Sequence, residues 1–140
     1  MTRARTFFLL NTNHSNDPRD DAAMLAHGRA AAFHDPWKHQ IERLQRGDVV
    51  FLYRSGTGIV AFGRASGALE VRDRHGDPLQ AGEEHAMELD DFTLLDAPLT
   101  AAEIRLVAER NITFQPTMTA LPPGAGERIL AAARVRALTP

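Results

Sequence analysis

The chain has 140 residues, of which 44% are hydrophobic and 24% charged, so it can bury one ordinary core and we expect a single domain spanning residues 1–140. It contains no cysteine, which excludes disulfides and thiolate metal sites and favours a cytoplasmic location. A net charge of −2, from 16 lysine and arginine against 18 aspartate and glutamate residues, argues against tight binding to a phosphate backbone regardless of sequence. The apolar run from Phe7 to Leu10 is too short for a signal peptide or a membrane span, so we expect no membrane partner.

The N-terminal part of the chain predicts a strand followed by a helix. Residues 6–11 form an apolar run that is typical of a strand buried on both faces. Asp17 can cap a helix predicted over residues 18–26, and Asp20 and Asp21 in its first turn complement the helix dipole. Because adjacent residues on a helix point in different directions, Asp20 and Asp21 do not form an acid–base pair, and we expect both to be solvated.

A second helix is predicted over residues 36–46. Trp37, Ile41 and Leu44 recur in it at helical spacing, which favours a core position for all three side chains. The alternative is that Trp37 stands beside Tyr53 at a concave site, because the helix leads directly into the strand that ends at Tyr53.

The next segment predicts a β-hairpin. Val49, Phe51 and Tyr53 alternate with other residues, so the apolar period changes from about 3.6 to 2 after the helix. Residues 54–58, Arg-Ser-Gly-Thr-Gly, form a turn that glycine permits, and residues 59–62 return as the partner strand. Tyr53 closes the inward face, where it either packs in the core or brings its hydroxyl group to the rim.

The second half of the chain predicts two more strands and two more helices. Thr100 and Glu103 form a capping box, which marks the start of a helix. The other expected elements are an exposed connection over residues 71–84, a strand over 87–95, a last strand over 111–119 and a closing helix over 127–138.

The stretch from Trp37 to Gly67 consists of a short helix, a strand with the pattern GDxVxxY and a strand with the pattern G-I-V-x-x-G. This stretch resembles the corresponding part of the PUA-like superfamily. Within it, the order of elements most resembles the EVE-type domains. The resemblance implies an α+β fold, a mixed, partly open β-barrel of about five to six strands with flanking helices. It also implies binding of nucleic acid around a modified or flipped base.

The resemblance further implies where a binding pocket lies. EVE-type domains form their pocket from the loop after the first strand, the aromatic segment before the second helix and the start of the central hairpin. The chain departs from the family after the first strand, where EVE-type domains commonly carry a Lys-Ser-Glu-Pro-like run. The corresponding ligand-binding candidates here are Asn11, Thr12, Asn13, His14, Phe33, Trp37, Tyr53 and Ser55.

We therefore expect a non-catalytic module that binds DNA or RNA, with aromatic stacking on a base and no cofactor. Arg29, Arg54 and Arg64 are the candidates for contacts with the phosphates. Gln115 and Thr117, with Thr119, share a face of the predicted last strand and are further candidates for the barrel mouth. The alternatives are a small-molecule or nucleotide binder, an enzyme on the same barrel, and a plain protein-interaction subunit.

A metal site is not expected from the sequence. His34, Asp35 and His39 are the best local candidates, but the five-residue spacing of the histidines does not place both rings on one helical face. Gly56, Thr57 and Gly58 lie between two predicted strands, which is typical of a hairpin turn rather than a phosphate-binding loop.

Overall fold

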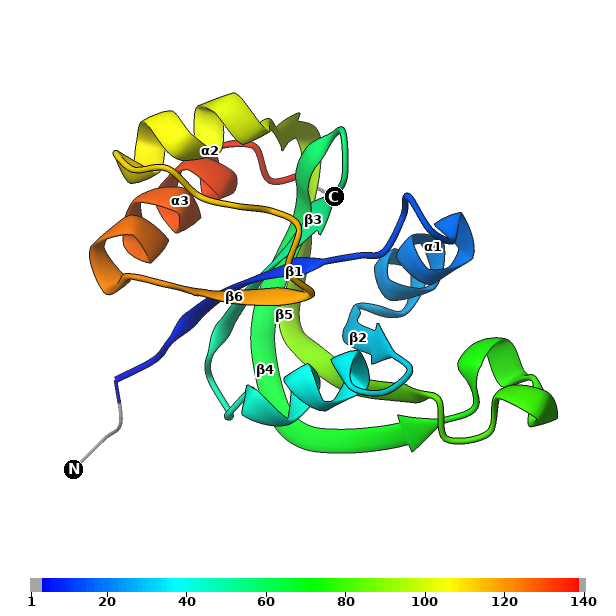
Figure 1. Cartoon of the computed structure of the whole chain (residues 1–140). Coiled ribbons are helices and arrows are strands. Elements are labelled where there is room, and N and C mark those ends of the chain that lie inside the picture. The colour runs from blue at the N-terminus through cyan, green and yellow to red at the C-terminus, as the bar shows by residue number, and fades with distance from the viewer. Residues whose placement is uncertain (1–3, 139–140) are drawn as a thin grey trace.

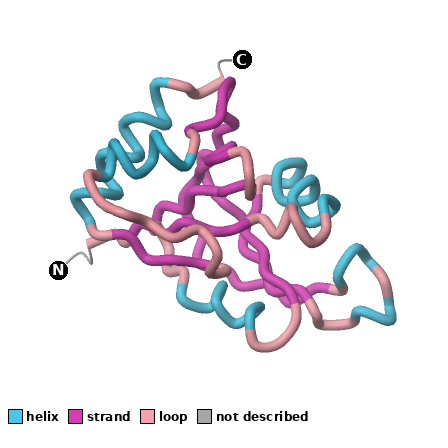
Figure 2. Tube along the Cα trace, turned by 45° about the horizontal axis from the view of Figure 1, so that its top comes forward, coloured by secondary structure: helices cyan, strands magenta, loops and turns pink. Residues whose placement is uncertain are grey.

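The computed structural model describes residues 4–138, and these residues form one curled, six-stranded sheet with helices on both sides (Figures 1 and 2). The strands lie in the order β2-β5-β4-β3-β1-β6. β1 is parallel to β3, and the other neighbouring pairs are antiparallel. This mixed sheet with flanking helices confirms the predicted α+β class. The strands are β1 (Phe7–Asn11), β2 (Arg29–Phe33), β3 (Val49–Arg54), β4 (Gly58–Arg72), β5 (Glu84–Leu99) and β6 (Met118–Leu121).

The helices cover the two faces of the sheet. Figure 1 shows α2 and α3 together on one side of the sheet and α1 on the other, beside β2. None of the helices among residues 4–138 is both long enough and apolar enough to cross a membrane. The helices are α1 (Pro18–His27), α2 (Ala101–Ala108) and α3 (Pro123–Val135), together with the 3₁₀ helices η1 (Trp37–Arg43), η2 (Arg74–Gly76) and η3 (Pro78–Gln80).

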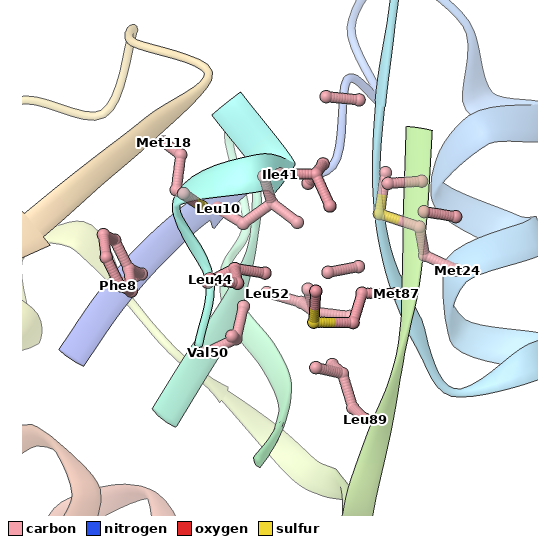
Figure 3. Close-up of a cluster of buried hydrophobic side chains, with 14 of the residues drawn as sticks. Phe8, Leu10, Met24, Ile41, Leu44, Val50, Leu52, Met87, Leu89 and Met118 are labelled. Carbon is pink, nitrogen blue, oxygen red and sulfur yellow. The ribbon is translucent and has the colours of Figure 1, made fainter. Parts of the chain in front are cut away.

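The sheet separates two hydrophobic clusters because successive side chains of a strand point to opposite faces. In β1, Phe7 and Leu9 pack into the cluster covered by α2 and α3. Phe8 and Leu10 pack into the other cluster, which also receives Met24 of α1 (Figure 3). Both faces of β1 are buried, as its continuous apolar run predicts.

The helix predicted over residues 36–46 is the shorter 3₁₀ helix η1, and this changes the position of Trp37. Ile41 is buried and Leu44, just after the helix, is also buried, but the Trp37 side chain is 55% exposed. With about three residues per turn, positions i and i+4 lie roughly 120° apart rather than on one face. The prediction that Trp37 packs in the core beside Ile41 is therefore wrong.

Three other element predictions differ from the structure. The alanine-rich run of β2 is not predicted as a strand from the sequence, yet Ala30, Ala31 and Ala32 pair with β5 and are buried. The exposed connection predicted over residues 71–84 is shorter, because β4 continues to Arg72 and β5 begins at Glu84. Of the strand predicted over residues 111–119, only the end is a strand, since β6 begins at Met118.

Candidate functional site

A cavity of about 730 Å³ opens where the ends of β1 and β3 meet the end of β2 and the start of η1. The loop that follows α2 closes one of its sides. Its lining consists of four aromatic rings and a larger number of polar groups. The lining residues are Asn11, Asn13, Ser15, Asn16, Ala31, Ala32, Phe33, His34, Trp37, Tyr53, Ser55, Arg74, Phe114, Gln115 and Thr117.

The aromatic part of the wall comes from four separate segments. Phe33 ends β2, Trp37 begins η1, Tyr53 lies near the end of β3, and Phe114 lies in the loop before β6. The rings of Tyr53 and Phe114 are stacked, with centroids 4.3 Å apart and planes 8° apart. Burial raises the pKa of the Tyr53 hydroxyl, with Arg105 acting weakly in the opposite direction. Tyr53 is therefore a neutral, packed ring, whereas Trp37 is free to contact a ligand.

The asparagines at the end of β1 hold the cavity wall in place. Asn11 Nδ2 donates to the carbonyl oxygen of Phe114 at 3.0 Å, and Asn11 Oδ1 accepts from the backbone N–H of Asn13 at 2.8 Å. Asn13 Nδ2 donates to Asp20 Oδ2 at 2.8 Å. These amide groups are occupied by the protein, so they shape the cavity more than they offer bonds to a ligand.

Several other polar side chains on the wall are available. Ser55, Gln115 and Thr117 form no side-chain hydrogen bond with any residue in the described range 4–138. The Gln115 amide can donate and accept, and the two hydroxyl groups can do either. The cavity thus combines flat apolar surfaces with unpaired hydrogen-bonding groups, which suits a planar molecule with polar edges.

A group of charged side chains around the buried Asp20 supports one side of the cavity. Arg74 Nη2 donates to Asp20 Oδ2 at 2.8 Å and to Asp17 Oδ2 at 2.9 Å, and its guanidinium group lies 5.3 Å from the centre of the Phe33 ring. A hydrogen bond from Arg19 lowers the pKa of Asp17, and Arg74 lowers it further. Arg74 therefore joins η2 to the start of α1 behind the cavity.

The expectation that Asp20 and Asp21 are solvated is wrong. Their exposures are 0% and 2%, because each faces an arginine from a distant part of the chain. Arg54 Nη2 donates to Asp21 Oδ2 at 2.8 Å, and Thr12 Oγ1 donates to Asp21 Oδ1 at 2.6 Å. A buried carboxylate is tolerated only with such partners, and a helix pattern alone does not reveal them.

His34, another cavity residue, lies between a carboxylate and an arginine. Its Nδ1 lies 3.0 Å from Glu83 Oε2, and its Nε2 lies 3.4 Å from Arg74 Nη1. Glu83 and Arg74 thus hold the His34 ring in a fixed orientation on the cavity wall. Within residues 4–138, no serine or threonine hydroxyl group forms a hydrogen bond with a histidine ring.

The structure brings together most of the ligand-binding candidates named from the sequence. Asn11, Asn13, Phe33, Trp37, Tyr53 and Ser55 all line the cavity. Thr12 is fully buried beneath it, and neither His14 nor Thr119 contributes to its wall. Sequence reasoning missed Ser15, Asn16, His34, Arg74 and Phe114, and of these only Phe114 carried a usable signal, as an aromatic residue beside the polar Gln115.

The arginines proposed for phosphate contacts lie apart from one another and are paired with carboxylates. Arg29 lies 3.7 Å from Glu84, and Arg54 is bound to Asp21 beside the cavity. Arg64 is paired with Asp91 at a second hollow of about 220 Å³, away from the cavity. Only Arg54 is adjacent in sequence to a cavity residue.

The amino-acid sequence matches no family model, and no curated protein matches it. Solved structures nevertheless share its fold. The CPSF4-YTH domain of Toxoplasma in its apo form is similar with a TM-score of 0.62 and 12% identity, over 97% of this chain and 90% of that chain. The Pho92 YTH domain in complex with m6A is similar with a TM-score of 0.60 and 14% identity, over 96% and 86%. A mutant form of ZmASCH from Zymomonas mobilis is similar with a TM-score of 0.60 and 12% identity, over 91% and 96%.

The curled mixed sheet and these structural relatives show that the chain shares the fold of the YTH domains and of ZmASCH, which agrees with the PUA-like fold predicted from the sequence. At these identities the likeness establishes the fold, and function has to be argued from the site itself.

Proposed function

We propose that this protein is a non-catalytic module that binds nucleic acid by taking one nucleobase into the cavity. A base is flat, apolar on its faces and polar at its edges, and the cavity has the complementary features. Exposed Trp37 and neighbouring Phe33 offer stacking surfaces, and the unpaired side chains of Ser55, Gln115 and Thr117 face the same space. The proposal rests on one observation: aromatic rings and unpaired hydrogen-bonding groups line the same cavity.

A modified base is the preferred ligand. Four rings line the cavity, so an added alkyl group on the base would contact apolar surface rather than water. One structural relative, the Pho92 YTH domain, was solved with m6A bound, which supports a base of this kind as the first to test.

The ion pairs of the arginines favour a second candidate, a free nucleoside. Arg29, Arg54 and Arg64 already face carboxylates, and the cavity's own arginine, Arg74, is bound to Asp17 and Asp20. Few cations therefore remain for a phosphate backbone. A nucleoside would use the same stacking and edge contacts and would need no cations, because it has no phosphate.

Fluorescence of the single tryptophan tests both candidates directly. Trp37 is the only tryptophan in the chain and lines the cavity, so stacking of a base on it should quench its emission. Single-stranded RNA and DNA with and without a methylated base are titrated, together with the free nucleosides. Saturable quenching with the highest affinity for an oligonucleotide supports the proposed nucleic-acid-binding module. Equal affinity for the nucleoside and the oligonucleotide supports the second candidate, and the absence of quenching by every probe excludes both.

A further inference from the structure

Two groups of side chains outside the aromatic wall have the chemistry of metal ligands. Within residues 4–138, these groups are His39, Glu42 and His85, and Asp17, Asp20 and His75, and in each the ligand atoms lie within 4.8 Å of one another. In the second group, Arg74 donates hydrogen bonds to both carboxylates. Its positively charged guanidinium group therefore already binds the oxygens that a metal ion would need. The first group has no arginine or lysine bound to its carboxylate among the described residues.

Both histidines of the first group direct a ring nitrogen at one carboxylate oxygen. His39 Nδ1 contacts Glu42 Oε2, and His85 Nδ1 lies 3.4 Å from the same oxygen. The His85 residue is only 8% exposed, and its Nδ1 forms no hydrogen bond with any residue between 4 and 138. A buried ring nitrogen without a hydrogen bond is unfavourable unless another partner satisfies it.

We propose that His39, Glu42 and His85 bind a divalent transition metal of the Zn²⁺ class. Two imidazole nitrogens and one carboxylate oxygen are a common set of protein ligands for zinc. Ligand bonds of about 2.0–2.2 Å place the ligand atoms of a tetrahedral site about 3.4 Å apart. The separation of His85 Nδ1 and Glu42 Oε2 already fits this value, whereas His39 Nδ1 and Glu42 Oε2 must move apart to admit the ion. The His39 and Glu42 side chains are 52% and 46% exposed, so they can make this movement and water can fill the fourth position.

Asp35 supplies a second reason to place a metal on His39. Its Oδ1 lies 2.7 Å from His39 Nε2, on the side of the ring opposite Glu42. A carboxylate bound to the far nitrogen of a ligating histidine orients the ring and strengthens it as a ligand. Asp35 is therefore a positioning residue in the proposed site.

The ligands come from two elements that are distant in sequence. His39 and Glu42 lie in η1, three positions apart, and His85 lies near the start of β5. A bound ion would tie η1 to strand β5, and η1 also carries Trp37. The existence of the site does not depend on what the cavity binds.

Calorimetric titration of the full chain with Zn²⁺, purified without a histidine tag, tests the proposal. Wild-type protein is expected to bind one equivalent, and the midpoint of thermal unfolding should rise with added Zn²⁺. Glu42→Gln and His85→Asn should each lose more than about 100-fold in affinity, and Asp35→Asn about 10–100-fold. Co²⁺ should give the visible absorption of a four-coordinate nitrogen and oxygen site, without contribution from sulfur because the chain has no cysteine.

His75→Asn is the matched control, since it removes a histidine from the other group and should leave Zn²⁺ binding unchanged. If His85→Asn does not fold, Glu42→Gln decides alone, because its side chain lies at the surface. No binding by the wild-type protein, or equal binding by wild type and Glu42→Gln, overturns the proposal. Loss of binding in His75→Asn with retention in Glu42→Gln overturns it in favour of the second group.

Discussion

The ring of Tyr53 lies parallel to the ring of Phe114, 4.3 Å away, and this contact joins strand β3 to a loop 61 residues further along the chain. The same loop is held by Asn11 Nδ2, which donates to the Phe114 carbonyl oxygen. Because both contacts lie on the wall of the cavity, the wall is assembled from three separate segments before any ligand enters. Such pre-organisation lowers the entropic cost of binding.

Trp37→Ala should abolish base binding while changing stability little. The Trp37 side chain is 55% exposed, so its removal leaves no large core cavity. Ile41→Ala, four positions later and fully buried, should instead cost about 2–5 kcal/mol of unfolding free energy. Calorimetric binding and urea denaturation of both variants check this.

Leu79→Ala is the control for Trp37→Ala, because Leu79 is 90% exposed and does not line the cavity. If Trp37→Ala binds the best oligonucleotide as tightly as Leu79→Ala does, stacking on Trp37 is not part of recognition.

Gln115→Ala should reduce discrimination between bases more than it reduces overall affinity. The Gln115 amide faces the cavity without a hydrogen bond to residues 4–138, and a side-chain amide that reads a base edge is worth about 1–3 kcal/mol. Affinities are measured for oligonucleotides that differ only at the inserted base. Gln45→Ala, at an exposed glutamine away from the cavity, should discriminate as the wild type does. If the Gln115→Ala variant keeps the base preference of the wild type, Gln115 does not contribute to base recognition.

Arg74→Met should destabilise the fold by about 3–5 kcal/mol, because it leaves Asp20 buried without the charge that pairs with it. It should also weaken ligand binding, since Arg74 lines the cavity and lies over the Phe33 ring. Arg110→Met, at an exposed arginine, should stay within about 0.5 kcal/mol of wild type. Chemical denaturation of the two variants provides the comparison, and equal stabilities would show that His75 and Asn13, which also contact Asp20, satisfy it without Arg74.

Tyr53 should titrate above the usual tyrosine value of 10.0, because burial disfavours its charged form. It is the only tyrosine in the chain, so ultraviolet absorbance of tyrosinate reports on it alone. A pKa raised in the folded state means that the folded form holds the proton more tightly than the unfolded form. The stability that this supplies is fully present below the unfolded value and is lost as the pH rises through the folded value. Tyr53→Phe should abolish the absorbance change, and a titration at or below 10.0 would show that the ring is solvated.

Binding to an oligonucleotide should depend weakly on salt. Because Arg29, Arg54 and Arg64 are paired with carboxylates, only about two to four phosphate contacts are expected, which gives a log–log slope of roughly −1.5 to −3.5. Titrations over a range of salt concentrations measure the slope. A much steeper slope without preference for any base would indicate a backbone binder in which the cavity has no role.

The local pattern of residues was sufficient to predict the helices and strands that depend on contacts between residues close in sequence. The alternation through Val49, Phe51 and Tyr53 and the glycine turn after them define the β3–β4 hairpin. The capping box of Thr100 and Glu103 marks the start of α2, with both of its hydrogen bonds present. The barrel fold and the ligand-binding candidates were predicted from the resemblance of residues 37–67, and of the order of elements, to EVE-type domains.

Only the tertiary structure decided the features that depend on contacts between distant segments. The alanines of β2 become a strand because β5 pairs with them, and no property of the run itself favours a strand. Asp20 is buried because Arg74, 54 residues away, reaches it, and His85 meets Glu42 through the same folding of β5 against η1. The periodicity of the sequence shows which side of a helix or strand is apolar. The topology of the fold decides which distant residue each side chain meets. The buried charge pairs and the proposed metal ligands therefore have no signal in the local sequence.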